Sequence, residues 1–137
     1  MKQHLTPFGE YIPLRSLAKK ISPLVNQVDD FSPGSEQKIF TIGQAKVAPV
    51  ICFELLDDEI LAEAAKSSNL LVVQTNSATF GTSAESAQQL SITRIRAIEH
   101  SRNIASVSTT GFSAIIDFEG KVVQKTAMGT AEHVFAA

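Results

Sequence analysis

The amino-acid sequence predicts a layered α/β fold for its 137 residues, a length that suits one domain. Between residues 46 and 101 the apolar pattern alternates between strand-like and helical segments. After residue 103, short apolar segments follow one another with turn residues between them, as in neighbouring strands. The composition, 44% hydrophobic and 19% charged, is that of a globular chain.

The first 36 residues are expected to be mostly irregular, because prolines and glycines interrupt them. A short helix is predicted at about 14–21, where apolar residues recur at helical spacing. Two strands follow, at 38–42 and at 46–52. Since proline cannot donate to a strand ladder, Pro49 predicts an edge or a bulge on one side of the second strand.

The period then becomes helical over 55–68, and the order of charges suits a helix dipole. Acidic side chains, expected to form a solvated helix start, come first and a basic one comes last: Asp57, Asp58, Glu59 and Lys66. The apolar run at 70–74 predicts a strand covered on both faces. Residues 46–74 therefore form one predicted βαβ unit.

A polar loop at 75–83 follows this strand, at the sheet edge where open α/β folds tend to bind ligands. The next helix is predicted at about 84–101, with an apolar stripe of Leu90, Ile92, Ile95 and Ile98. Strands are expected at 103–109 and 112–117, the latter forming a hairpin with residues 122–125.

Bulk properties exclude several classes of protein. A net charge of −2 with scattered basic residues argues against nucleic-acid binding. Within these residues no apolar run approaches the ~18 residues of a membrane-spanning helix. The histidines are dispersed and match no metal-ligand spacing (His4, His100, His133), so we expect no metal and no cofactor.

Cys52, the single cysteine, stands where an apolar strand meets an acidic helix start. A strand-to-helix turn presents a nucleophile beside free backbone N–H groups, which can stabilise an oxyanion. Such a thiol needs a neighbouring base or cation, and a cation would lower its pKa. Free cysteines are also among the most buried residues, so position alone favours a packing role. Glu54, by itself, is typical of a helix cap.

Two motifs alter this balance: "KQHLTPFGEYIP" at 2–13 and "VICFE" at 50–54. Together they resemble the apolipoprotein N-acyltransferases, membrane enzymes with an extracytoplasmic nitrilase-like (carbon-nitrogen hydrolase) domain. The resemblance continues through 70–81, in a form typical of actinobacterial members, and through 91–117. It implies that residues 1–137 form the C-terminal portion of a nitrilase-like αββα sandwich.

The resemblance also implies site residues. Cys52 would be the nucleophile that accepts an acyl chain from a phospholipid as a thioester. Lys2 would stabilise the oxyanion and the thiolate, and the Phe53 N–H would complete the oxyanion hole. Glu10 and Glu54 match acidic positions beside the site, where they would orient Lys2 or assist proton transfer. Many members carry tyrosine at position 53, so a hydroxyl contact is missing here.

The general-base glutamate and the membrane helices of this family precede the matching lysine, so both are expected to lie outside this chain. The isolated chain is accordingly expected to be inactive. In the complete protein the partners would be a phospholipid donor and an apolipoprotein acceptor, at the extracytoplasmic face of the plasma membrane. Two alternatives remain open: part of a soluble nitrilase-type amidase acting on small amides, and a non-catalytic binding domain of the same fold.

Overall fold

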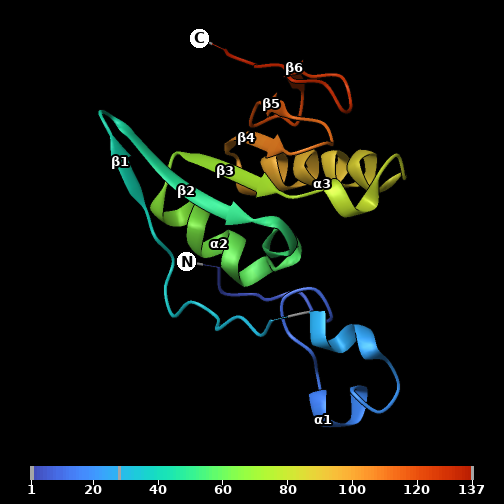
Figure 1. The fold of residues 1–137 in the computed structure, drawn as a ribbon. Helices are drawn as coiled ribbons and strands as arrows, with labels where there is room; N and C mark the ends of the chain where they lie inside the picture. The colour runs from blue at the N-terminus through green and yellow to red at the C-terminus, as the bar shows by residue number, and fades with distance from the viewer. Residues whose placement is uncertain (1, 28, 137) are drawn as a thin grey trace.

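The computed structural model describes residues 2–27 and 29–136 (Figure 1). Within them, six strands form one mixed sheet whose spatial order follows the chain, β1 to β6. The strands are β1 Phe40–Ile42, β2 Ala45–Ile51, β3 Leu70–Thr75, β4 Asn103–Ser108, β5 Ala114–Ile116 and β6 Val122–Lys125. β2, β3 and β4 run parallel, whereas β1, β5 and β6 pair antiparallel with their neighbours.

Two helices connect the parallel strands. Helix α2, Asp58–Ser67, joins β2 to β3, and helix α3, Glu85–His100, joins β3 to β4. The predicted βαβ unit at 46–74 is therefore confirmed, as are the α/β class and the C-terminal hairpin of β5 and β6. Short 3₁₀ turns precede each helix, η2 at Cys52–Leu56 and η3 at Ala78–Phe80.

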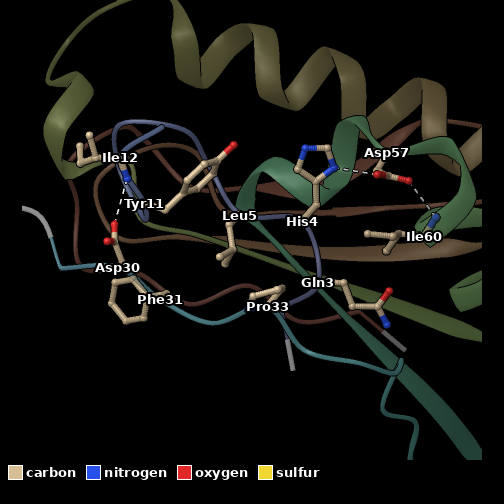
Figure 2. Close-up of a pocket in the computed structure, with 10 residues that line it drawn as sticks. All are labelled: Gln3, His4, Leu5, Tyr11, Ile12, Asp30, Phe31, Pro33, Asp57 and Ile60. Atoms are coloured by element: carbon tan, nitrogen blue, oxygen red, sulfur yellow. Dashed lines mark hydrogen bonds and ion pairs between the residues drawn. The ribbon is translucent and has the colours of Figure 1, made fainter. Parts of the chain in front are cut away.

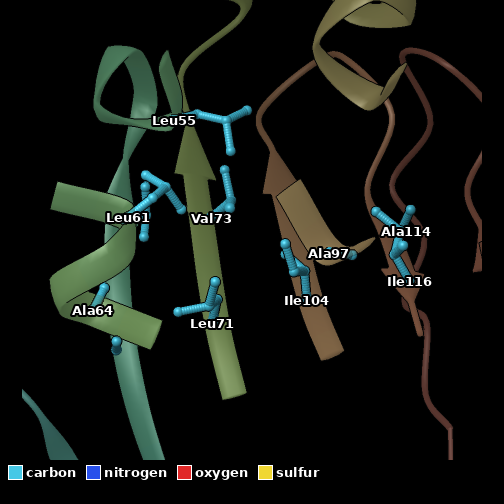
Figure 3. Packing of buried hydrophobic residues seen from close by; sticks show 11 residues of the cluster. Leu55, Leu61, Ala64, Leu71, Val73, Ala97, Ile104, Ala114 and Ile116 are labelled. Carbon is cyan, nitrogen blue, oxygen red and sulfur yellow. The ribbon is translucent and has the colours of Figure 1, made fainter. Parts of the chain in front are cut away.

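The hydrophobic core lies between the sheet and these two helices (Figure 3). It consists of Ala48, Val50, Leu55, Leu61, Ala64, Leu71, Val73, Ala97, Ile104, Ala114 and Ile116. Along β3 the pleat sends Leu71 and Val73 into this core, while Leu70 and Val72 on the other face stay half-buried. The prediction that both faces of 70–74 are covered is thus wrong for the described residues.

Helix α3 buries only part of its predicted apolar stripe. Leu90 and Ile92 pack against the core, but Ile95 and Ile98 are 61% and 56% exposed. Thr93 and Ala97 are fully buried in their place. Small side chains on this face let the helix approach the sheet closely. The spacing of the apolar residues does not show that this is the buried face.

The N-terminal region differs most from the prediction. Helix α1 spans only Arg15–Ala18, and the 3₁₀ helix η1, Pro23–Gln27, was not predicted. Leu17 and Ile21 of the predicted helix are exposed, because they contact no core that would extend it. Among the described residues, no helix is long and apolar enough to cross a membrane.

The prediction for Pro49 is confirmed. Strand β1 pairs only with residues 45–47 of β2, so it does not cover the flank of β2 at Pro49. There the Pro49 carbonyl accepts a hydrogen bond of 2.8 Å from the Gln37 side chain. The predicted strand at 38–42 is correspondingly shorter and begins at Phe40.

Candidate active site around Cys52

Cys52 stands at a sharp turn between β2 and η2. Its φ of 53° lies in the left-handed region, which side-chain-bearing residues seldom adopt and which costs about 1 kcal/mol. The thiol is half-buried and accepts a hydrogen bond from the Phe53 N–H. The predicted strand-to-helix turn is present, with a backbone donor at the sulfur.

Glu54 ties the N-terminal segment to this turn. Its carboxylate is buried at 2% exposure and accepts a hydrogen bond from the Ile51 N–H at 2.8 Å. The same carboxylate accepts hydrogen bonds from the backbone N–H groups of Gln3 and, at 3.4 Å, His4. These contacts are to the main chain, so the Glu54 carboxylate joins the N-terminal segment to the turn at Cys52.

Lys2 and Glu10 form a partly buried ion pair. Lys2 Nζ lies 2.5 Å from Glu10 Oε2 and 3.4 Å from Thr6 Oγ1. Glu10 also accepts a hydrogen bond of 2.7 Å from the Thr6 N–H. Burial alone would raise the pKa of Glu10, but the hydrogen bonds from Lys2 and Thr6 hold it below its ordinary value. Glu10 therefore stays ionised and orients the ammonium group of Lys2.

The charges of Lys2 and Glu10 both act on the thiol of Cys52, as its pKa shows. Burial raises the pKa of Cys52, while the charge of Lys2 and the Phe53 N–H lower it. Glu10 and Glu85 raise it again, and the net shift is upward. The cation expected from the sequence is present, but burial and two carboxylates outweigh it.

A cavity of about 270 Å³ opens beside the thiol. It is lined by Thr6, Cys52, Phe53, Leu55, Leu56, Thr75, Phe80, Glu85, Gln88, Gln89 and Ile92. The lining is mostly apolar, and it includes Thr75 and Phe80 from the loop at 75–83. The predicted loop thus lies beside the thiol, and its part in binding a ligand stays a prediction.

A larger hollow of about 630 Å³ lies along the N-terminal segment, where the lining residues do not include Cys52, Lys2 or Glu10 (Figure 2). His4 Nδ1 lies 2.7 Å from Asp57 Oδ2 there. Asp57 also caps helix α2 through the Glu59 and Ile60 N–H groups, both at 3.1 Å. Asp57 is therefore a cap that holds the segment, not part of a solvated helix start.

Two further residues near the turn, Arg96 and Glu85, are not predicted from the sequence. The Arg96 side chain is only 12% exposed although it is charged, and its Nε donates to the Leu55 carbonyl at 2.9 Å. It also pairs with Asp58 at 2.7 Å. Glu85 lines the thiol cavity from the first turn of α3. No sequence pattern marks either residue, because both depend on how α3 docks onto the turn.

Among the described residues, no group of three or more His, Cys, Asp or Glu side chains could hold a metal ion. The arrangement at the turn is instead one of a thiol, a cation and backbone N–H groups. Such groups suit nucleophilic attack on a carbonyl with stabilisation of the resulting oxyanion.

The family assignment follows from the sequence model for carbon-nitrogen hydrolases, which matches residues 2–137. The chain belongs to this family. Among curated relatives, the apolipoprotein N-acyltransferase of Nitrosomonas europaea is 38% identical over 132 residues, covering 94% of this chain and 26% of the relative. That of Geobacter metallireducens is 37% identical over 122 residues, covering 88% and 23%.

An actinobacterial relative, from Mycolicibacterium smegmatis, is 34% identical over 91% of this chain and 21% of its own length. Its identity to this chain is no higher than that of the two other relatives, so the actinobacterial form of the motif at 70–81 is not distinguished by overall identity. The chain spans about a quarter of the length of these relatives, between 21% and 26%.

Solved structures of the nitrilase superfamily share the fold. A CN-hydrolase superfamily protein of Xanthomonas campestris, crystallised with an arsenic adduct in its active site, has a TM-score of 0.62 at 19% identity. The match covers 91% of this chain and 46% of that one. An amidase of Nesterenkonia has a TM-score of 0.60 at 17% identity, covering 72% and 40%. The nitrilase-like fold predicted from the two motifs is confirmed.

Proposed function

We propose that this chain is the C-terminal portion of the nitrilase-like domain of an apolipoprotein N-acyltransferase. The domain would transfer an acyl chain from a phospholipid, through a thioester on Cys52, to the N-terminal amine of a diacylglyceryl-cysteine lipoprotein. The observation that carries this proposal is that the Glu54 carboxylate joins the backbone N–H groups of Gln3 and Ile51, the chain neighbours of Lys2 and Cys52. The charge of Lys2 thereby acts on a thiol that stands at a left-handed turn.

Each proposed role has support in the contacts. The charge of Lys2 favours the Cys52 thiolate, and Glu10 holds that ammonium group by a contact of 2.5 Å. The Phe53 N–H already donates to the sulfur, and it would donate to the oxyanion once the carbonyl is attacked. Glu54 keeps Gln3 and His4, and therefore Lys2, against the turn.

The net upward shift in the pKa of Cys52 supports the idea that a further group completes the site. A thiol of raised pKa carries little thiolate at neutral pH, so a general base must take its proton. We propose that this base is a glutamate outside these residues, and that the isolated chain is inactive without it. Membrane segments of the complete protein would bring both substrates to the extracytoplasmic face of the plasma membrane.

The relatives favour acyl transfer over amide hydrolysis. Those named apolipoprotein N-acyltransferase are 32–38% identical over about nine-tenths of this chain, whereas the Nesterenkonia amidase is 17% identical and supports the fold alone. A non-catalytic domain would have no use for a thiol that lines a cavity, accepts a backbone hydrogen bond and feels the charge of a lysine.

The reading frame upstream of the Met1 codon tests the proposal. We expect it to stay open and to encode a glutamate-bearing first half of the domain, preceded by several apolar segments of about 20 residues. A stop codon with a ribosome-binding site directly before Met1 would refute the proposal for this gene product.

A further inference from the structure

Glu85 presents an unsatisfied carboxylate to the cavity beside Cys52. Its Oε2 atom is buried and has no hydrogen-bond partner among the residues that the structure describes. Among the described residues that line this cavity, it is also the one with a charged side chain. A buried, unpaired carboxylate oxygen is costly, so its position in the cavity calls for a partner that the described residues do not supply.

The other charges around the thiol are already paired. Lys2 is held by Glu10 at 2.5 Å, and the buried carboxylate of Glu54 is occupied by backbone N–H groups. Glu85 is nevertheless close enough to Cys52 for its charge to act on the thiol. A ligand group that satisfies Glu85 would therefore lie near the sulfur as well.

The remaining lining defines what that group would be. Apart from Glu85 and the thiol, the polar side chains of the cavity are hydroxyls and amides. The side-chain amide of Gln89 already donates a hydrogen bond to Thr75 Oγ1. A phosphate would be repelled by Glu85, whereas a primary ammonium carries both the opposite charge and the N–H donors that Oε2 lacks. The ligand chemistry that fits is thus an alkylammonium group with apolar surroundings.

We propose that Glu85 binds the α-ammonium group of the acceptor beside the acylated Cys52. This inference rests on the proposed function. A phospholipid ethanolamine headgroup also carries an ammonium, but a phosphate and a glycerol separate it from the reacting ester. In the acceptor the ammonium nitrogen is itself the reacting atom, so it must enter the cavity that Glu85 and Cys52 both line.

The step balances as a proton transfer followed by acyl transfer. Glu85 takes one proton from the ammonium, which leaves a neutral amine with a free electron pair. That nitrogen attacks the thioester carbon, so that the C–N bond forms and the C–S bond breaks. The nitrogen loses its second proton to the departing Cys52 thiolate, which becomes a thiol, and Glu85 then releases its proton to water.

Charge selectivity of the thiol tests this site without any acyl transfer. Cys52 is modified with 2-aminoethyl methanethiosulfonate, which carries a primary ammonium, and with the neutral methyl methanethiosulfonate. The ratio of the two rates cancels the thiolate fraction, which Glu85 also affects. We expect Glu85→Gln to lower this ratio about tenfold, and the matched exposed control Glu63→Gln to leave it unchanged. An unchanged ratio in Glu85→Gln, or an equal fall in Glu63→Gln, would overturn the proposal.

Protection of the unmodified protein provides a second measurement, which needs no variant to fold. S-methylcysteine methyl ester is expected to slow the neutral reagent, while its N-acetyl derivative, which lacks the ammonium, has no effect. Equal effects of these two compounds, or protection by glycerophosphoethanolamine alone, would refute an acceptor site. Because neither assay requires a thioester, a failure of this site and a failure of the proposed function give different results.

Discussion

The two parts of the molecule that meet at Cys52 are held together in different ways. The α/β framework that carries the thiol is packed through a continuous apolar core. The N-terminal segment that carries Lys2 has little regular structure, and carboxylates hold it instead: Glu54 on its main chain, Asp57 on His4, and Glu10 on Lys2 itself.

This difference shows how the site divides its tasks. Packing fixes the nucleophile, because the turn at Cys52 is continuous with β2 and α2. Ionised side chains fix the cation, so its position depends on pH and on single hydrogen bonds. Damage to the framework should unfold the protein, whereas damage to the carboxylates should release Lys2 while the sheet persists.

The largest effect is expected in the framework. Leu71→Ala should lower the free energy of unfolding by about 3 kcal/mol, because Leu71 is fully buried in the core and leaves a cavity. Its neighbour Leu70 is half-buried on the other sheet face, so Leu70→Ala should cost less than about 1 kcal/mol. Urea denaturation measures the free energy of unfolding of both variants. Equal losses would show that the two faces of β3 do not differ in burial.

Glu54→Gln tests the link between the two parts. The amide places a donor where the carboxylate accepted backbone N–H groups, and we expect a loss of about 2 kcal/mol. Hydrogen exchange should show faster opening at Gln3 and His4 than in β3. If these amides keep their protection relative to β3, Glu54 does not hold the segment.

Lys2→Met tests the cation. Removing the positive charge should raise the pKa of Cys52 further, so that alkylation by iodoacetamide at pH 8 slows several-fold. Lys20→Met, at an exposed lysine, is the matched control and should leave the rate unchanged. A Lys2→Met rate equal to that of the unmodified chain would remove Lys2 from the site.

The smallest effect concerns acid. Burial opposes ionisation of Glu10, and hydrogen bonds from Lys2 and Thr6 more than offset it, so its pKa is lowered on folding. The hydrogen bond from His4 lowers the pKa of Asp57 likewise. A carboxyl group whose pKa is lowered on folding stabilises the fold at any pH above its ordinary pKa of about 4. This stabilisation is lost as the pH falls through the pKa of the group in the folded protein.

The N-terminal segment should therefore loosen below about pH 4 while the sheet remains. Hydrogen exchange at pH 6 and pH 3, corrected for intrinsic rates, measures this difference. Glu10→Gln should reduce the difference in exchange of the N-terminal segment between pH 6 and pH 3. Glu59→Gln, at an exposed residue, should leave this difference unchanged. If the segment and the sheet lost their protection at the same pH, ionised carboxylates would not be what holds the segment.

The same division explains what the sequence could predict. The strands, the helices and the turn at Cys52 depend on local periodicity, and they were found within a few residues of their bounds. The buried face of α3 and the single covered face of β3 depend on tertiary packing, which periodicity does not determine. Ile95 and Ile98 therefore belong to the apolar stripe read from the sequence, although both are exposed.

The site divides in the same manner. Motif resemblance pointed to Lys2, Glu10, Cys52, Phe53 and Glu54, and the structure brings them together, although their roles in a reaction stay predictions. Glu85 and Arg96 lie on a helix whose docking no motif specifies, and so they emerged only from the structure.

All the proposed roles at the turn depend on transfer of the acyl group through Cys52. In a protein that includes the proposed upstream half and membrane segments, incubation with phospholipid vesicles should give a hydroxylamine-sensitive thioester on Cys52, detected by mass spectrometry of the intact peptide. Cys52→Ala should lack both this adduct and lipoprotein acylation. Acylation of the lipoprotein at an unchanged rate by Cys52→Ala would contradict the account.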